Sequence, residues 1–371
     1  MRVLHIVTGL ASGGAERQLQ LLLRHLPPHQ QCEVVALTNP GAVAAALRAD
    51  GVAVHHLDMR GNRDLGALPR LVRLVRTGRY DLVHTHLYRA QLYGRLAARL
   101  AGVRAVVSTE HSLHAGVIEG RPVTRGVKGL YLAAERLGST TIAVSRQVAQ
   151  TLHSWGVPPG RVELIPNGIE AARYRRPPAE RAAVRHRMRA ELGLPQGSWV
   201  IGGLGRLVPD KRFEVLLETL ADLDRDTRLV LVGAGPERAA LERRAAELGV
   251  RERLVLTGER DDVPDLLTAL DVLASPSIRE TFGLGVLEGL AAGLPVRHSA
   301  CPALDELPPA AAPQARRIPS EPAAYTAALR DLRQSDARTA DPLAHPPAVG
   351  HYDIVRVAAD LGALYDRLAR A

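Results

Sequence analysis

The sequence predicts an α/β protein of two doubly wound domains, each a parallel sheet with helices on both faces. The length of 371 residues suits two domains, since a domain takes about 100–200 residues. Short runs that are apolar throughout alternate with amphipathic segments, and such strands are typical of parallel sheets buried on both faces. A polar stretch rich in Arg and Pro interrupts this alternation, which then restarts. We therefore predict a first domain over 1–170, a linker over 171–189 and a second domain over 190–350, and expect a C-terminal helix within 351–371 to pack back on the first domain.

The individual elements follow the same patterns. In the first half, strands are predicted at 3–8, 33–38, 53–57, 82–86, 105–108, 141–144 and 162–165, and helices at 14–26, 68–76, 90–100, 126–137 and 146–155. In the second half, strands are predicted at 200–204, 229–232, 254–256, 272–274 and 295–296, and helices at 213–223, 237–248, 263–270, 285–292 and 354–368. The Pro- and Ala-rich stretch 302–322 is expected to be irregular. Ligands of such sheets bind outside the carboxyl ends of the strands, so a cleft between the domains is the expected site.

The composition excludes several classes of protein. Hydrophobic residues at 46% and charged residues at 23% are ordinary for a soluble globular chain. Cys32 and Cys301 lie far apart, which excludes a disulfide scaffold and a thiolate metal cluster. The apolar run at the start is too short for a secretory signal, and no stretch reaches the ~18 residues of a spanning helix. We expect a cytoplasmic protein, peripheral on the inner membrane face if it meets a membrane.

The charge is unevenly distributed. Residues 1–170 carry 20 basic and 11 acidic side chains, whereas 171–371 carry 28 of each, so the net charge of +9 belongs to the first half. An anionic partner or a solubilising surface would explain this excess. In the predicted helix 68–76, Arg70, Arg73 and Arg76 lie beside an apolar set, and Arg125 and Lys128 belong to a second basic helix. One hypothesis is that the first domain docks on an anionic membrane surface; the alternative is a sheet-covering helix with arginines on its wet face.

A glycine-rich turn follows the first predicted strand and opens the first helix. It reads Thr8-Gly-Leu-Ala-Ser-Gly-Gly-Ala-Glu16. Glycines let the backbone approach a ligand, and a helix N-terminus favours an anion such as a diphosphate. The spacing is not the Gly-x-Gly-x-x-Gly of dinucleotide-binding proteins, and a plain tight turn remains an alternative.

The second motif follows the first strand of the second half and reads Gly205-Arg-Leu-Val-Pro-Asp-Lys-Arg-Phe213. Arg206 and Lys211 lie five residues apart across a turn and could converge on one pair of phosphates. The chain has 46 arginines and two lysines, so Lys211 suggests a place for a compact ammonium. The alternative is a chance surface lysine, and Phe213 is expected in the core.

The third motif reads Arg279-Glu-Thr-Phe-Gly-Leu-Gly-Val-Leu-Glu288. Glu280 lies in a loop, Glu288 lies in the following helix, and the intervening backbone offers N–H groups at the helix start. Carboxylates that accept from hydroxyls, beside N–H donors, suit a polyol such as a sugar. The alternative is that both carboxylates merely decorate the helix entry.

Taken together, these motifs resemble those of retaining glycosyltransferases of family 4, which have the GT-B fold of two Rossmann-like domains facing across a cleft. The resemblance rests on segments that occur in the family's order: Gly13-Gly-Ala-Glu16, Ile165-Pro-Asn-Gly-Ile169, Gly205-Arg with Lys211, Val232-Gly-Ala-Gly-Pro-Glu237, and Glu280-x-Phe-Gly with Glu288 and Ala292-Gly-Leu-Pro-Val296. The chain departs from the family pattern at Arg297-His-Ser-Ala-Cys-Pro-Ala-Leu-Asp305-Glu306, where a Gly-rich loop is usual, and at Thr281, where Gly or Ser is common.

The resemblance implies a role for each motif. Arg206 and Lys211 would hold the donor diphosphate, helped by Gly13 and Gly14. Glu280 and the backbone of Phe282, Gly283 and Leu284 would hold the sugar hydroxyls, and Glu288 the ribose. Glu16 and Asn167, which lie in matching motifs, are assigned to the substrate. His111 in Thr109-Glu-His-Ser112 matches a histidine often found near the transferred sugar, although a lone histidine is also commonly structural.

By this resemblance the protein would transfer a hexose-type sugar with retained anomeric configuration from a UDP- or GDP-sugar to a glycan, lipid-linked or small-molecule acceptor. No metal or other cofactor is expected, because the two cations can stabilise the leaving diphosphate. Two alternatives remain: a nucleotide-sugar 2-epimerase of the same fold, and a non-enzymatic anion-binding module. Nucleic acid is not expected as a partner, because the basic half lacks interleaved aromatics.

Overall fold

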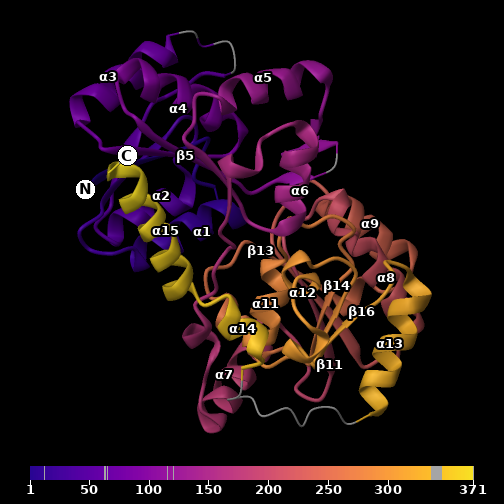
Figure 1. Cartoon of the computed structure of the whole chain (residues 1–371). Coiled ribbons are helices and arrows are strands. Elements are labelled where there is room, and N and C mark those ends of the chain that lie inside the picture. The colour runs from indigo at the N-terminus through magenta and orange to yellow at the C-terminus, as the bar shows by residue number, and fades with distance from the viewer. Residues whose placement is uncertain are drawn as a thin grey trace. The chain divides into compact units, whose positions relative to one another are not determined.

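The protein forms two compact units (Figure 1). The computed structural model describes residues 1–11, 13–61, 64, 66–114, 116–119, 121–335 and 345–370. The first unit comprises Met1–Gly168 together with Ile354–Ala371, and the second comprises Ile169–Asp353. Each unit is an α/β layer structure around a parallel sheet.

The first unit is built on a seven-stranded parallel sheet with the order β10-β9-β5-β4-β1-β2-β3. Its strands are β1 (Arg2–Val7), β2 (Gln31–Ala36), β3 (Ala53–His56), β4 (Leu82–His86), β5 (Ala105–Glu110), β9 (Thr140–Ala143) and β10 (Val162–Leu164). A small antiparallel sheet adds β6 (Leu113–His114), β7 (Val117–Ile118) and β8 (Arg121–Pro122). The helices are α1 (Gly14–His25), α2 (Gly41–Ala49), α3 (Ala67–Gly78), α4 (Tyr88–Ala101), α5 (Arg125–Glu135), α6 (Arg146–Trp155) and α15 (Ile354–Arg370), with a 3-10 turn at Pro159–Arg161.

Alternate side chains of β1 face opposite layers of helices. Leu4 and Ile6 join the core that α3 and α4 cover. Val3 belongs instead to a core shared with Leu22 of α1 and with the apolar face of α15. Because successive strand residues point to opposite faces, His5 lies on the face of Val3. The last described helix therefore closes the sheet with which the chain begins.

The second unit is built on a six-stranded parallel sheet with the order β13-β12-β11-β14-β15-β16. Its strands are β11 (Trp199–Leu204), β12 (Thr227–Val232), β13 (Leu254–Gly258), β14 (Val272–Ser275), β15 (Val296–His298) and β16 (Ala315–Arg317). Its helices are α7 (Pro178–Glu191), α8 (Phe213–Asp222), α9 (Arg238–Glu247), α10 (Val263–Thr268), α11 (Leu284–Ala291), α12 (Pro302–Asp305), α13 (Pro322–Gln334) and α14 (Pro347–His351). Short 3-10 turns lie at Ala171–Tyr174, Pro209–Lys211, Arg251–Arg253 and Pro309–Ala311.

Both sheets have the doubly wound order, in which the winding direction reverses once. The reversal falls between β1 and β4 in the first unit and between β11 and β14 in the second. Loops at the carboxyl ends of these strand pairs therefore diverge to opposite faces and leave a crevice, which is where such sheets bind ligands.

The structure differs from the predicted linker. Most of 171–189 belongs to α7, which packs on the second unit through Val184 and Met188 against Ala269. The arginines that suggested a solvated linker form hydrogen bonds within the second unit. Arg185 and Arg189 each donate to a different oxygen of Asp271, at 2.7 and 2.9 Å, and Arg189 is 1% exposed.

The stretch 302–322 is also more regular than predicted. It contains α12 and β16, and β16 extends the sheet by pairing with β15. Cys301 lies directly before α12 and is fully buried, with its thiol 3.6 Å from the carbonyl of Phe282. Arg297 of the atypical segment lies on β15, mostly buried, and donates to the carbonyl of Val296. Helices α2, α13 and α14 were not predicted.

None of the helices in the described ranges is at once long and apolar enough to span a bilayer.

Candidate functional site

In the second unit, the two predicted motifs follow the two strands at the point of reversal. Arg206 and Lys211 come after β11, and Glu280 comes after β14, the strand beside it. The fold thus brings together two segments that lie 69 residues apart in the sequence. The Lys211 ammonium donates to Glu280 Oε1 at 2.5 Å, and the two side chains are 22% and 14% exposed. Arg206 is exposed and lies in the loop that follows β11, five residues before Lys211.

Glycines allow the loops after β11 and β12 to pack backbone against backbone. Gly205 donates its N–H to the carbonyl of Val232 at 3.0 Å. Gly233 has φ +138°, and a Cβ at this position would lie 2.1 Å from the carbonyl oxygen of Gly205. A side chain there would force the loops apart. These glycines therefore position the segment that carries Arg206 and Lys211.

The backbone N–H groups predicted as donors lie at the start of α11. Gly283 precedes the helix with φ +102°, and Leu284 is its first residue. A Cβ on Gly283 would lie 2.5 Å from Cys301 Sγ, so this turn accepts only glycine without rearrangement. The Phe282 ring is 2% exposed and packs edge-on against Tyr352, with centroids 5.0 Å apart. Phe282 can therefore offer its backbone but not its ring to a ligand.

Glu288 lies on α11. Its Oε1 accepts from the Tyr174 hydroxyl at 3.0 Å. Tyr174 comes from the 3-10 turn at Ala171–Tyr174, in the segment predicted as a linker. Tyr174 was not among the predicted site residues, because nothing in the sequence signals that this turn reaches α11.

In the first unit, Gly13 and Gly14 lie at the start of α1, where helix N–H groups favour an anion. Glu16 is the third residue of that helix. A Cβ on Gly13 would lie 2.2 Å from Glu16 Oε2, so the Glu16 carboxylate folds back over the helix N-terminus. This arrangement stabilises the helix dipole in the way that an acidic first turn does. Asn167 is buried in the loop after β10.

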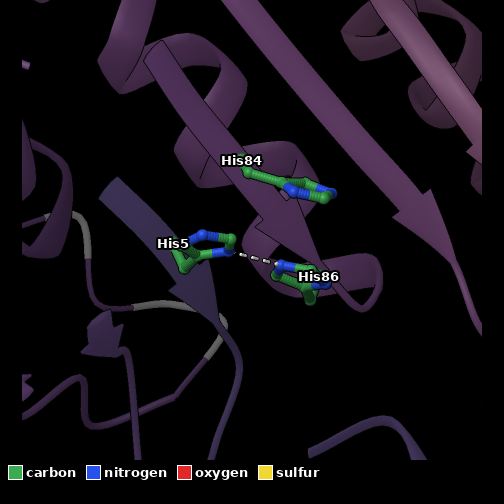
Figure 2. Close-up of side chains that lie close together, drawn as sticks. All are labelled: His5, His84 and His86. Atoms are coloured by element: carbon green, nitrogen blue, oxygen red, sulfur yellow. Dashed lines mark hydrogen bonds between the residues drawn. The ribbon is translucent and has the colours of Figure 1, made fainter. Parts of the chain in front are cut away.

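His111 follows β5 and lies at the end of a row of buried histidines that the sequence analysis missed. His5 on β1 and His84 and His86 on β4 are all at most 1% exposed (Figure 2). His5 Nδ1 lies 3.1 Å from His86 Nε2, and His86 Nδ1 lies 3.2 Å from His111 Nε2. The sequence did carry a signal for this cluster, because two histidines at alternate positions interrupt the apolar pattern of the strand β4. Their meeting with His5 depends on the order of the strands.

Desolvation lowers the pKa of each of these rings. It lowers the pKa of His5 to about 3 and that of His111 to about 4. For His84 and His86 the pKa also falls well below its ordinary value, mainly through burial and secondarily through neighbouring histidines. All four rings are therefore neutral at pH 7 and can serve as hydrogen-bond donors, acceptors or metal ligands.

Ring nitrogens of His5, His84 and His86 lie within 4.8 Å of one another, which is a spacing that a metal ion could use. The chemistry of the donors fits a hydrogen-bonded cluster better. Both His84 nitrogens already have partners, Tyr365 Oη at 2.5 Å and Thr109 Oγ1 at 2.7 Å. The His84 ring also packs against the His86 ring in a tilted contact, with centroids 4.1 Å apart and planes inclined by 33°. Both His86 nitrogens also face partners, His5 Nδ1 at 3.1 Å and His111 Nε2 at 3.2 Å, so both histidines of β4 already have hydrogen-bond partners at each nitrogen.

Glu110, the last residue of β5, is a second buried titratable group beside His111. Burial raises its pKa to about 7, and hydrogen bonds from Gln91 and Tyr131 oppose that rise. The carboxyl is 1% exposed. A group with such a pKa carries a proton for part of the time at neutral pH.

Two Rossmann-like units of this topology define the GT-B class of glycosyltransferase folds. Over its whole length the chain resembles solved structures of this class, among them Anabaena HepE in complex with UDP and glucose. That structure superposes with a TM-score of 0.86 at 22% identity and covers 99% of this chain and 100% of that chain.

Residues 12–173 match the family described as Glycosyltransferase Family 4, and residues 184–331 match Glycosyl transferases group 1. The D-inositol 3-phosphate glycosyltransferase of Acidothermus cellulolyticus is 31% identical over 79% of this chain and 68% of its own length. The 2-deoxystreptamine glucosyltransferase of Streptomyces kanamyceticus is 35% identical over 62% of each chain, so this chain spans about three fifths of that relative. The chain belongs to the family 4 glycosyltransferases.

Proposed function

We propose that this protein is a retaining glycosyltransferase that moves a hexose-type sugar from a nucleoside-diphosphate sugar to a hydroxyl of a glycan, lipid-linked or small-molecule acceptor. The observation that carries the proposal is the Lys211–Glu280 pair at the point of reversal of the second sheet, beside the loop of Arg206. The complex of HepE with UDP and glucose supports a UDP-sugar as donor. We accordingly assign donor binding to the second unit, which the sequence predicted over 190–350.

The ion pair suits a site that exchanges partners when the donor binds. Lys211 is partly exposed, so a diphosphate can reach its ammonium and share or replace Glu280 as partner. Glu280 then becomes available to accept from sugar hydroxyls. Arg206 adds a second positive charge. As the bond between the sugar and the diphosphate breaks, negative charge grows on the leaving group, and two fixed cations stabilise it without a metal.

The remaining residues receive supporting roles. The backbone N–H groups at Gly283 and Leu284 are assigned to sugar oxygens, and Glu288, held by Tyr174, to the ribose hydroxyls. Gly13 and Gly14, Glu16 and Asn167 are assigned to the substrate, and His111 to the transferred sugar. No side chain in the motifs is an obvious covalent nucleophile, so we infer attack on the same face from which the diphosphate leaves.

A donor panel tests this proposal. UDP-glucose, UDP-galactose and GDP-mannose are added singly, and thermal unfolding is measured. A donor present at 100 times its Kd raises the free energy of unfolding by about 2.7 kcal/mol. Release of UDP or GDP only in the presence of an acceptor, with the product's anomeric configuration retained by NMR, supports transfer. Conversion of the donor to its epimer without acceptor would identify the epimerase instead, and no thermal shift with any donor would overturn the assignment.

Two variants separate the proposed site from general charge effects. Lys211→Ala is expected to lower kcat by about 10²- to 10³-fold, because it removes a fixed cation from the leaving group. Arg279→Ala is the matched control: this exposed arginine lies in the same loop as Glu280 but pairs with Asp210 at 3.0 Å. Activity of Lys211→Ala equal to that of Arg279→Ala would contradict the role of Lys211. Full activity in EDTA is expected.

A second proposal concerns the basic face of the first unit. Leu68, Pro69, Val72 and Leu100 of α3 and α4 line an open apolar groove of about 520 Å³, and Arg73, Arg76 and Thr77 belong to its lining as well. Two of the three arginines singled out by the sequence already bond within the unit. Arg70 pairs with Asp64 at 2.9 Å, and Arg76 donates to the Leu100 carbonyl at 2.7 Å.

We infer that the groove meets an anionic lipid surface, with Arg73 as the cation of its lining. The apolar lining suits acyl chains, and the positive charge of residues 1–170 suits anionic headgroups. Flotation with vesicles of phosphatidylcholine and phosphatidylglycerol at low salt tests this. Arg73→Glu is expected to weaken binding, at about 1 kcal/mol per basic side chain, more than Arg104→Glu, which lies outside the groove. Failure of the parent protein to float would refute this inference.

A further inference from the structure

We propose that His86 and His5 are positioning residues for His111: the three rings form one hydrogen-bonded chain that fixes the tautomer and the orientation of the His111 ring. The inference rests on the proposed function for its consequence in catalysis. Its structural part concerns only residues of the first unit.

The three rings are oriented for in-plane hydrogen bonds. The planes of His5 and His86 are inclined by 16°, with centroids 5.4 Å apart, and those of His86 and His111 by 26°, with centroids 5.5 Å apart. The joining nitrogens lie 3.1 and 3.2 Å apart, within or at the edge of hydrogen-bond distance. Near-parallel planes let the N–H of one ring point along its own plane at the lone pair of the next.

The chain imposes a rule on the tautomers. A neutral imidazole has one N–H and one lone pair, and His86 uses both nitrogens within the chain. If His86 donates through Nδ1, its Nε2 must accept from His5, and His111 must carry its proton on Nδ1. If His86 donates through Nε2, both His5 and His111 must carry their ring proton on Nε2. His5, His86 and His111 therefore all share one tautomer, either Nδ1–H or Nε2–H.

Burial makes this rule strict. His5 and His86 are 0% and 1% exposed, so water does not reach them to satisfy a mismatched pair. His5 Nε2 has no hydrogen-bond partner among the described residues, so the chain ends there. The other end is His111, whose side chain is partly exposed although its second nitrogen, Nδ1, is buried. The buried rings thereby determine whether His111 Nδ1, the nitrogen that the chain does not use, is a donor or an acceptor.

His84 packs against the chain of three rings from one side. The His84 ring makes a tilted contact with the His86 ring, and its own nitrogens bond to Thr109 and to Tyr365 of α15. His84 shares no hydrogen bond with the three rings, so its tautomer is set separately. It acts as packing that prevents the His86 ring from turning.

The direct test is NMR of the full chain with ¹⁵N-labelled histidine at pH 7, in which two-bond ¹H–¹⁵N correlations distinguish the neutral tautomers. Single substitutions to Asn assign the signals. One common tautomer for His5, His86 and His111 is expected. Unlike tautomers among the three, or tautomer populations that differ from one ring to another, would overturn the chain. This measurement needs no activity, so it remains decisive if the proposed function fails.

Variants of His86 then test the effect on catalysis. His86→Leu breaks both bonds and is expected to lower kcat by about 10- to 100-fold with the donor KM within about twofold, as misplacement of a catalytic group does. His86→Asn places an amide near the former Nδ1 position and is expected to restore most of the activity. Thr85→Val is the control: it removes a buried hydrogen bond from the same strand, between Thr85 and Ser108 at 2.6 Å. A loss in Thr85→Val equal to that in His86→Leu, or no rescue by His86→Asn, would reduce the chain to a structural role.

Discussion

Replacing His5 with Asn is expected to make the first unit more resistant to acid. Burial lowers the pKa of His5 to about 3 from an ordinary value of 6.5, so the ring stays neutral in the fold while it becomes charged in the unfolded chain. Between these two values the unfolded state binds more protons, and stability falls as the pH falls. At pH 5, which is about 1.5 units below the ordinary pKa, the loss is about 2 kcal/mol for this ring. At pH 7 it is close to zero.

The two tryptophans allow this loss to be measured separately in each unit. Trp155 lies on α6 of the first unit and Trp199 on β11 of the second. In a Trp199→Phe background, urea unfolding followed by Trp155 fluorescence reports on the first unit at pH 7 and pH 5. His5→Asn keeps a polar group near the Nδ1 position that faces His86, but removes the titration.

The difference between parent and variant isolates His5 from other titrating groups. The parent is expected to lose about 2 kcal/mol more than His5→Asn between pH 7 and pH 5. The exposed His153, replaced by Asn in the same background, is the control and is expected to follow the parent. Equal losses in the parent and in His5→Asn would refute the assignment of a buried, neutral His5.

Three further predictions concern buried groups. Burial raises the pKa of Glu110 to about 7, so the carboxyl ionises at a lower pH in the unfolded chain than in the fold, and stability falls as the pH rises toward 7. Between pH 5 and pH 8 this loss is about 2–3 kcal/mol, and Glu110→Gln is expected to abolish it in urea titrations. An unchanged profile would count against this prediction. Asp271→Ala leaves the buried Arg189 without its carboxylate and is expected to lower the unfolding free energy of the second unit by about 3–5 kcal/mol; a loss below about 1 kcal/mol would show that the arginine finds another partner. Gly283→Ala places a Cβ 2.5 Å from Cys301 Sγ at φ +102° and is expected to lower Tm, with partial recovery in a double variant with Cys301→Ala; a Tm equal to the parent's would contradict the close approach.

Local signals in the sequence predicted most of the architecture. The helix predicted at 146–155 coincides with α6, and the strand predicted at 82–86 coincides with β4. The motifs around Arg206 and Glu280 were assigned to strand ends from apolar runs alone, and the structure places them after β11 and β14. These features depend on the periodicity of a few neighbouring residues, which is the information that a sequence displays directly.

The features that were missed depend on contacts between distant segments. The arginines of α7 looked like a solvated linker because their partner, Asp271, lies more than 80 residues away. The histidine cluster needs β1 beside β4 and the return of α15 with Tyr365. Tyr174 reaches Glu288 across 114 residues. No local pattern encodes such meetings, because they follow from strand order and helix packing.

The return of α15 to the first unit has a consequence for synthesis on the ribosome. Its apolar face packs with Val3 and Leu22, and its Tyr365 hydroxyl caps a buried histidine. The whole second unit lies between these partners in the sequence. During translation the first sheet therefore emerges with the part of one face that α15 covers still open and His84 without its Tyr365 partner, and it waits until the second unit has been made. The inserted unit has no such dependence, so it can complete its core before the unit that precedes it does.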